Sequence, residues 1–180
     1  EFHIPAYIAL GLDPEKTTVY FQSENKDVIH MAYKLSQKVT TSEINAAYGS
    51  CSPGRIMSSL TQMGDILYPQ INNRMPGIIP VGIDQEPHIR LTRDVLQKMK
   101  KENFILPSAI YHKYTPSLDG EMKMSKSKPE SCIELPEDEK KVCKKLKRAL
   151  TGGRDTLEEH RRLGADIEKD MIFELFKPHL

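Results

Sequence analysis

Apolar residues follow two different periods along the first part of the chain, and these periods predict alternating strands and helices. Apolar positions recur every three or four residues in four stretches, which predicts helices; these stretches are 25–39, 42–48, 55–68 and 87–101. Short runs rich in β-branched and apolar residues predict strands; they cover 17–22, 78–83 and 108–111. The run 78–83 is almost continuously apolar, which is typical of a strand buried on both faces of a parallel sheet.

From about residue 136 onward the pattern contains helices only. We expect them at 140–150, at 156–163 and from about Asp166. Strands alternating with helices, followed by helices alone, favour an α/β fold. The prediction is a partial Rossmann-type parallel sheet with helices, followed by an all-helical C-terminal segment. We place the domain boundary between residues 135 and 136.

Composition fits this fold and excludes several classes of protein. The 180 residues are 38% hydrophobic and 28% charged, as in a globular protein with a sizeable core. Lys and Arg number 26 against 25 Asp and Glu, a net charge of +1, which excludes a wholly basic nucleic-acid binder but permits a local basic face. No apolar run approaches the roughly 18 residues that a membrane span needs.

The cysteines and the chain ends bear on location and completeness. Cys51, Cys132 and Cys143 are odd in number and lack C-x-x-C spacing. They predict free thiols of a cytoplasmic protein, with neither a disulfide framework nor a zinc site. The chain begins with Glu1 and stops soon after the apolar run 171–176, so we expect a piece of a longer protein.

The string Lys123-Met124-Ser125-Lys126-Ser127 is the most specific local motif. Two lysines three positions apart on a Ser-rich loop can reach one polyphosphate, because each ammonium is a compact charge with three donors. Such a loop can also be a solvated surface segment. The complete string resembles the KMSKS signature of class I aminoacyl-tRNA synthetases.

A second motif, Gly82-Ile83-Asp84-Gln85, follows the predicted strand 78–83. Ligands of open α/β sheets bind at the carboxyl ends of strands, although Asp84 can also be the cap of an ordinary strand-to-helix turn. The longer strings 82–94 and 151–161 resemble tryptophanyl-tRNA synthetases of the archaeal and eukaryotic branch, and the resemblance runs from about Leu10 to the C-terminus.

This resemblance implies roles in amino-acid binding. Gln62 and Asp65 are three positions apart on a predicted helix and so share a face, where solvent exposure is the alternative to ligand binding. By resemblance, Gln62 contacts the ammonium group of the amino acid, Gln85 its carboxylate, and Asp65 an indole N–H or a phenol O–H. Because Asp65 can also accept from the phenol O–H of a tyrosine substrate, a tyrosyl-tRNA synthetase is the alternative.

The resemblance also implies an ATP site. Asp84 is expected to hold the ribose, and Lys123 and Lys126 to contact the phosphates as catalytic residues, Lys126 above all. Met124 is expected near the adenine, with Ser125 and Ser127 in the same ATP-binding loop. Mg²⁺ is implied as the companion of ATP, tryptophan and tRNA(Trp) as the other substrates, and a homodimer as the assembly. No metal-binding cluster is visible in the sequence.

One family motif is missing. The six histidines contain no His-x-Gly-His pair, and in the family that motif lies upstream of the matched region. Residues 1–135 therefore resemble the C-terminal half of the catalytic domain, and 136–180 the start of the helical anticodon-binding domain. We expect the chain alone to be inactive in tryptophan activation. A non-catalytic tRNA-binding or signalling fragment of a synthetase is the alternative.

Two further groups of residues have competing interpretations. The basic run 140–148 contains six cations and suits either tRNA phosphates or a solvated helix face. His30, His88 and His112 have no convincing partner in the sequence, and we interpret them as structural.

Overall fold

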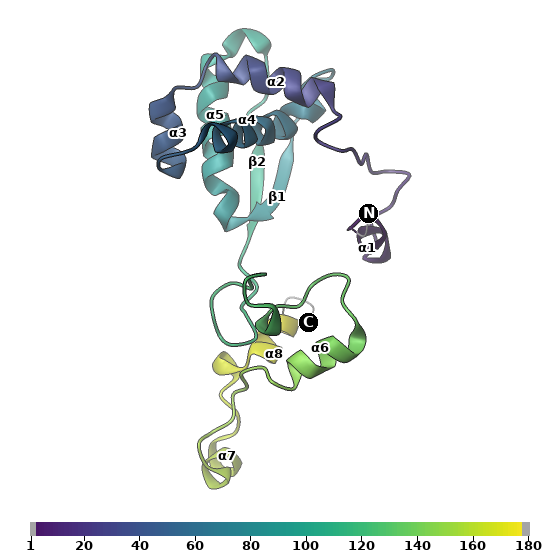
Figure 1. Cartoon of the computed structure of the whole chain (residues 1–180), viewed down its shortest axis with the longest axis vertical. Helices are drawn as coiled ribbons and strands as arrows, with labels where there is room; N and C mark the ends of the chain where they lie inside the picture. Colours follow the sequence, from purple (N-terminus) through teal and green to yellow (C-terminus); the bar gives the residue numbers. More distant parts are fainter. Residues whose placement is uncertain (1–2, 178–180) are drawn as a thin grey trace. The chain divides into compact units, whose positions relative to one another are not determined.

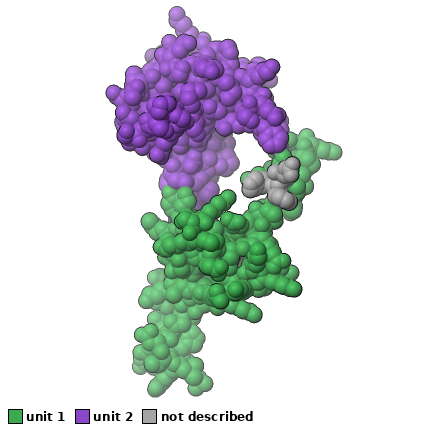
Figure 2. All heavy atoms as spheres, viewed as in Figure 1, with its two compact units in different colours: residues 1–17, 114–180 green, residues 18–113 purple. Residues whose placement is uncertain are grey.

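The computed structural model describes residues 3–177 and divides into two compact units (Figure 2). Unit 1 contains residues 1–17 and 114–180, as far as they are described, and unit 2 contains residues 18–113. In the described part of the chain, no helix has the length and apolarity needed to cross a bilayer. The domain boundary predicted between residues 135 and 136 does not coincide with the division into these two units. It stays a prediction.

Unit 2 contains the four helices that the periodicity predicts (Figure 1), and three of them begin with a side-chain cap. The Asn25 side chain accepts from backbone N–H groups at the start of α2, and Ser52 does so at α4. Thr40 and Glu43 form a reciprocal capping box at α3. The helices are α2 (Lys26–Ser36), α3 (Thr41–Tyr48), α4 (Pro53–Leu67) and α5 (Glu86–Lys98).

Two parallel strands form the sheet of unit 2. Strand β1 (Ile78–Gly82) pairs with β2 (Ser108–His112), with Ile78 opposite Ser108 and Gly82 opposite His112. Helix α5 makes the crossover connection that parallel strands require. The α/β class and the parallel pairing predicted from the sequence are thereby confirmed.

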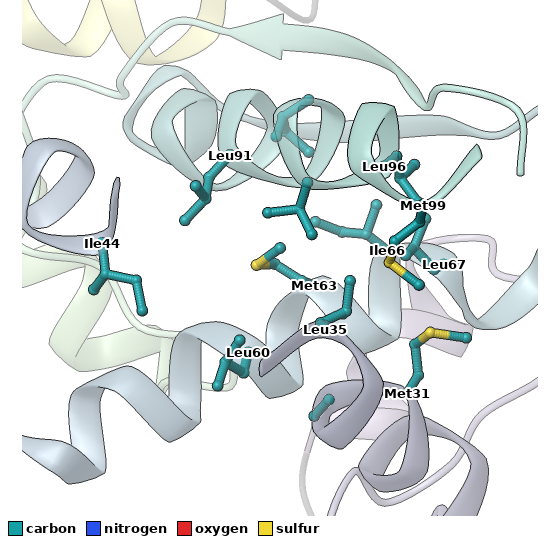
Figure 3. Packing of buried hydrophobic residues seen from close by; sticks show 13 residues of the cluster. Met31, Leu35, Ile44, Leu60, Met63, Ile66, Leu67, Leu91, Leu96 and Met99 are labelled. Atoms are coloured by element: carbon teal, nitrogen blue, oxygen red, sulfur yellow. The ribbon is translucent and has the colours of Figure 1, made fainter. Parts of the chain in front are cut away.

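The core of unit 2 lies between α2, α4 and α5 (Figure 3). Leu35, Met63, Leu67 and Val95 have no exposed surface. Helices α2 and α4 approach so closely that a Cβ on Gly64 would lie 2.6 Å from the backbone oxygen of Val28. Glycine at this position is therefore a packing requirement.

Two strand predictions were wrong in part. Residues 17–21 form no strand, because a strand needs a hydrogen-bonded neighbour and the sheet of the described residues has only β1 and β2. Strand β1 is buried on one face instead of two: Ile79 and Val81 pack on the core, whereas Ile78 is 63% exposed. Among the described elements, helices cover only one face of this sheet.

Unit 1 contains helices and loops without a strand in its described residues. Backbone hydrogen bonds connect its distant segments: Leu118 to Ser131, Leu150 to Leu118, and Met171 to Leu150. The helices are α1 (His3–Ala9), α6 (Glu139–Leu146), α7 (Leu157–Leu163) and α8 (Met171–Phe176). The helical C-terminal segment is confirmed, with α6 ending four residues earlier than predicted.

Candidate functional site

The amide side chains of Gln62 and Gln85 meet in unit 2. Gln62 comes from α4, and Gln85 ends the short 3-10 helix η2 (Ile83–Gln85) that follows β1. Gln62 Nε2 donates to Gln85 Oε1 over 2.7 Å, and both residues are partly exposed. Each amide keeps capacity for a ligand, since Gln85 retains its NH₂ group and Gln62 its carbonyl oxygen. Two residues that the sequence assigns to one amino-acid substrate are thus in contact.

Asp84 is exposed, and its carboxylate folds back over the end of β1. A Cβ on Gly82 would lie 2.5 Å from Asp84 Oδ1 and 3.5 Å from His112 Cε1, so the carboxylate occupies the space that the glycine leaves open. Asp84 does not cap α5: the N-cap residue is Gln85, and it makes no side-chain capping bond. The capping alternative for Asp84 is therefore wrong.

Asp65 accepts hydrogen bonds from two residues of the segment 17–22. Tyr20 donates its phenol O–H to Asp65 Oδ1 over 2.9 Å, and Gln22 Nε2 donates to Oδ2. Burial, and then the bond to Asp65, raise the pKa of Tyr20 well above its ordinary value. Each carboxylate oxygen of Asp65 thus accepts one hydrogen bond from within the chain and keeps a second lone pair for a donor of a ligand.

A half-buried pair, Tyr48 and His88, was missed by sequence reasoning, and its histidine lies one turn beyond Gln85. Tyr48 Oη and His88 Nδ1 are 2.8 Å apart, and the two rings are in contact at a tilt of 37°, with centroids 4.7 Å apart. Burial, with Arg55 nearby, lowers the pKa of His88 below 6.5. The available signal was the position of His88, which shares a helical face with Gln85.

The KMSKS-like loop belongs to unit 1. Lys123 Nζ lies 4.9 Å from the ring centroid of Tyr114, a cation–π contact, and the hydroxyl oxygens of Ser125 and Ser127 are 2.9 Å apart. Met124 N donates to Thr115 O over 3.1 Å, which anchors the start of the loop. Met124 is also the half-buried member of the string.

Two lysines of this loop region differ in their surroundings. Lys128 is paired with Asp119 and Glu121. Lys126 is exposed, and in the described part of the chain no carboxylate lies within 4.0 Å of its ammonium group. Of these two cations, Lys126 is the one left available to an anionic ligand.

Comparison with known proteins gives the family of the chain. The family model described as "tRNA synthetases class I (W and Y)" matches residues 1–178. The chain belongs to this family. The Tryptophan–tRNA ligase of Methanocaldococcus jannaschii is 47% identical over 99% of the chain.

Solved structures agree with this assignment. The tryptophanyl-tRNA synthetase of Aeropyrum pernix K1 has a TM-score of 0.89 at 42% identity over 99% of the chain. The Campylobacter jejuni tryptophanyl-tRNA synthetase complexed with ADP and tryptophan has a TM-score of 0.71 at 29% identity, over 97% of this chain and 56% of that one. The chain spans half the length of the M. jannaschii and A. pernix proteins.

Proposed function

We propose that the full-length protein is a tryptophan–tRNA ligase. It activates tryptophan with ATP to tryptophanyl-adenylate and pyrophosphate, and then transfers the tryptophanyl group to tRNA(Trp). The observation that carries this proposal is the likeness, along almost the whole chain, to archaeal relatives named Tryptophan–tRNA ligase.

The amino-acid site is proposed to include Gln62, Asp65 and Gln85. Gln62 offers its carbonyl oxygen to the ammonium group of tryptophan, and Gln85 offers its NH₂ group to the carboxylate. Their mutual hydrogen bond supports these assignments, because it fixes which end of each amide faces the ligand. Asp65 is proposed to accept from the indole N–H through the capacity left beside Tyr20 and Gln22.

The ATP site is proposed to include Asp84 for the ribose, Met124 near the adenine, and Lys123 and Lys126 for the phosphates, with Ser125 and Ser127 in the same loop. A carboxylate oxygen of tryptophan attacks the α-phosphorus, and the bond from that phosphorus to the oxygen of the leaving pyrophosphate breaks. Negative charge grows on the pyrophosphate during this step. A lysine that meets this charge lowers the barrier without covalent chemistry.

Magnesium is proposed to arrive with ATP and to neutralise phosphate charge. Residues 3–177 contain no group of three or more His, Cys, Asp or Glu side chains placed to hold a metal ion. The ligands proposed for the ion are phosphate oxygens of ATP, as is usual for magnesium with nucleotides. Homodimer assembly and a cytoplasmic location stay predictions.

ATP–pyrophosphate exchange by the full-length protein tests the proposal. We expect exchange with tryptophan and none with tyrosine, because a site built to pair a buried polar group rejects a ligand that does not match it. Exchange with tyrosine would reverse the specificity and assign the phenol to Asp65. No exchange with either would favour a non-catalytic tRNA-binding or signalling protein.

The 180-residue chain alone and an Asp65→Asn variant complete this test. We expect no exchange by the chain alone. Asp65→Asn in the full-length protein is expected to raise KM for tryptophan, because an amide is a poorer acceptor for the indole N–H. An unchanged KM would mean that Asp65 only accepts hydrogen bonds from Tyr20 and Gln22 and does not bind tryptophan.

A further inference from the structure

Helix α6 carries a strip of exposed cations along one face. Lys140, Lys144 and Lys147 are spaced four and three positions apart, which places them one above another on a helix. Together with Cys143, Arg148 and one carboxylate, Glu139, they line an open hollow. The strip runs about 10 Å along the helix axis, from seven residues at about 1.5 Å each.

The acidic residues that precede the helix do not neutralise this strip. Glu137 forms an ion pair with Lys145, whose side chain is only 10% exposed and also donates to the backbone oxygen of Cys132. The Lys145 ammonium lowers the pKa of the Glu137 carboxyl below its usual value. Asp138 accepts from the first backbone N–H groups of α6 as its cap.

Lys140, Lys144 and Lys147 keep their charge exposed to solvent. Within residues 3–177, no carboxylate lies within 4.0 Å of their ammonium groups. Arg148, at the end of the strip, has only a loose pair with Glu130 at 3.6 Å. The strip therefore presents three unneutralised lysines and one weakly paired arginine.

The stability of α6 explains the lysines near its C-terminal end but not Lys140. Lysines in the last turn of a helix interact favourably with its dipole, and Lys144 and Lys147 fit that role. Lys140 lies in the first turn, where the same dipole disfavours a positive charge. A cation at that end continues the strip at a cost to the helix, which indicates an anionic partner.

We propose that the α6 face formed by Lys140, Lys144, Lys147 and Arg148 binds the sugar-phosphate backbone of tRNA. The proposal rests on the proposed function, in which tRNA is a substrate. A lysine ammonium suits phosphate as a point charge, and a strip of several cations suits a chain of phosphates better than one small anion. The apolar residues Val142 and Leu146 are half-buried, so the helix lacks the exposed apolar face that membrane binding requires.

The test compares two triple variants of the full-length protein. One is Lys140→Gln/Lys144→Gln/Lys147→Gln. The matched control, Lys26→Gln/Lys100→Gln/Lys101→Gln, removes the same charge from exposed lysines of unit 2. The dissociation constant for tRNA is measured between 50 and 200 mM salt, and tryptophan-dependent ATP–pyrophosphate exchange, which needs no tRNA, is measured in parallel.

The α6 variant is expected to bind tRNA on the order of a hundredfold more weakly at low salt, with a salt slope shallower by about 2 to 3. Its exchange rate is expected to match that of the parent. Equal weakening by the two variants, unchanged tRNA binding by the α6 variant, or a parent that binds no tRNA would overturn the proposal. If the parent shows no ATP–pyrophosphate exchange but the α6 variant still binds tRNA more weakly than the control variant, the proposed function is contradicted. The same result supports tRNA binding by the α6 face.

Cys143 supplies a second readout, because it is the exposed cysteine and lies in the hollow. In a Cys51→Ser background, tRNA is expected to protect Cys143 from alkylation by a maleimide. Protection by vesicles containing phosphatidylserine, with none by tRNA, would overturn the RNA assignment in favour of a membrane surface.

Discussion

Gln62 Nε2 donates a 2.7 Å hydrogen bond to Gln85 Oε1, joining α4 to the end of η2 across 23 positions of sequence. This bond makes the two amides interdependent. If Gln62 is replaced by Ala, Gln85 loses the partner that orients its NH₂ group toward a substrate carboxylate.

We expect Gln62→Ala and Gln85→Ala each to raise KM for tryptophan, and the double variant to lose less than the sum. The coupling is expected to be about 1 kcal/mol, the net worth of one hydrogen bond. Exchange kinetics of the four proteins measure it. Additivity within about 0.3 kcal/mol would mean that each amide acts alone.

Lys126→Ala is expected to slow adenylate formation about a hundredfold, or roughly 3 kcal/mol, with little change in tryptophan affinity. The reason is that the lysine meets charge that develops only as pyrophosphate leaves. Single-turnover kinetics in the full-length protein measure the rate.

Lys128→Ala is the matched control for that experiment, because Lys128 is an exposed lysine of the same loop region already paired with Asp119 and Glu121. Its loss is expected to change the rate less than about fivefold, since exposed ion pairs contribute at most about 1 kcal/mol. If the two variants are equally slow, general loop charge and not Lys126 governs the step.

Protonation of His88 is expected to destabilise unit 2. Burial lowers the pKa of His88 in the folded protein, so the unfolded chain binds the proton more tightly. This contribution to stability is present above pH 6.5 and is lost as pH falls below that value toward the lowered pKa. Urea unfolding of the parent at pH 7.5 and 5.5 measures the loss, and His88→Gln is expected to remove it. An identical pH dependence in His88→Gln would assign it to other groups.

Two glycines of α4 form a matched pair for stability. A Cβ at Gly64 would lie 2.6 Å from the Val28 oxygen, whereas one at Gly54 would meet nothing within 4 Å. Gly64→Ala is expected to destabilise by about 2 kcal/mol, because overpacking outweighs the better helix propensity of Ala. Gly54→Ala is expected to be neutral or stabilising by up to about 1 kcal/mol. Chemical denaturation of the two variants compares them, and equal stabilities would mean that α2 moves away from α4 without penalty.

The helices were predictable because each carries its own signal. The stripe of Val28, Ala32 and Leu35 gives α2 its period, and all three side chains are buried. Segment 17–22 carries a local strand signal as well. Its outcome depended on a neighbouring strand, which no local pattern reports, and its side chains Tyr20 and Gln22 bond to Asp65 instead.

The candidate site residues stay predictions. The motif strings named Gln62 and Gln85, but the contact between them depends on how α4 packs beside η2. The Tyr48–His88 pair joins residues 40 positions apart, and neither belongs to a spacing that suggests the other. Side-chain partners set by tertiary packing were the part that the sequence alone could not supply.

The parallel pairing of β1 with β2 has a consequence for how the chain folds. Each pair in this ladder, such as Ile78 with Ser108, joins residues thirty positions apart, and α5 lies between them in the chain. Contacts of such long sequence separation require loop closure before any of them forms, which slows folding relative to a bundle of adjacent helices. We therefore expect strand pairing to be a late event in the folding of unit 2. The apolar residues of the two strands are expected to stay exposed in the newly synthesised chain until α5 packs on the core.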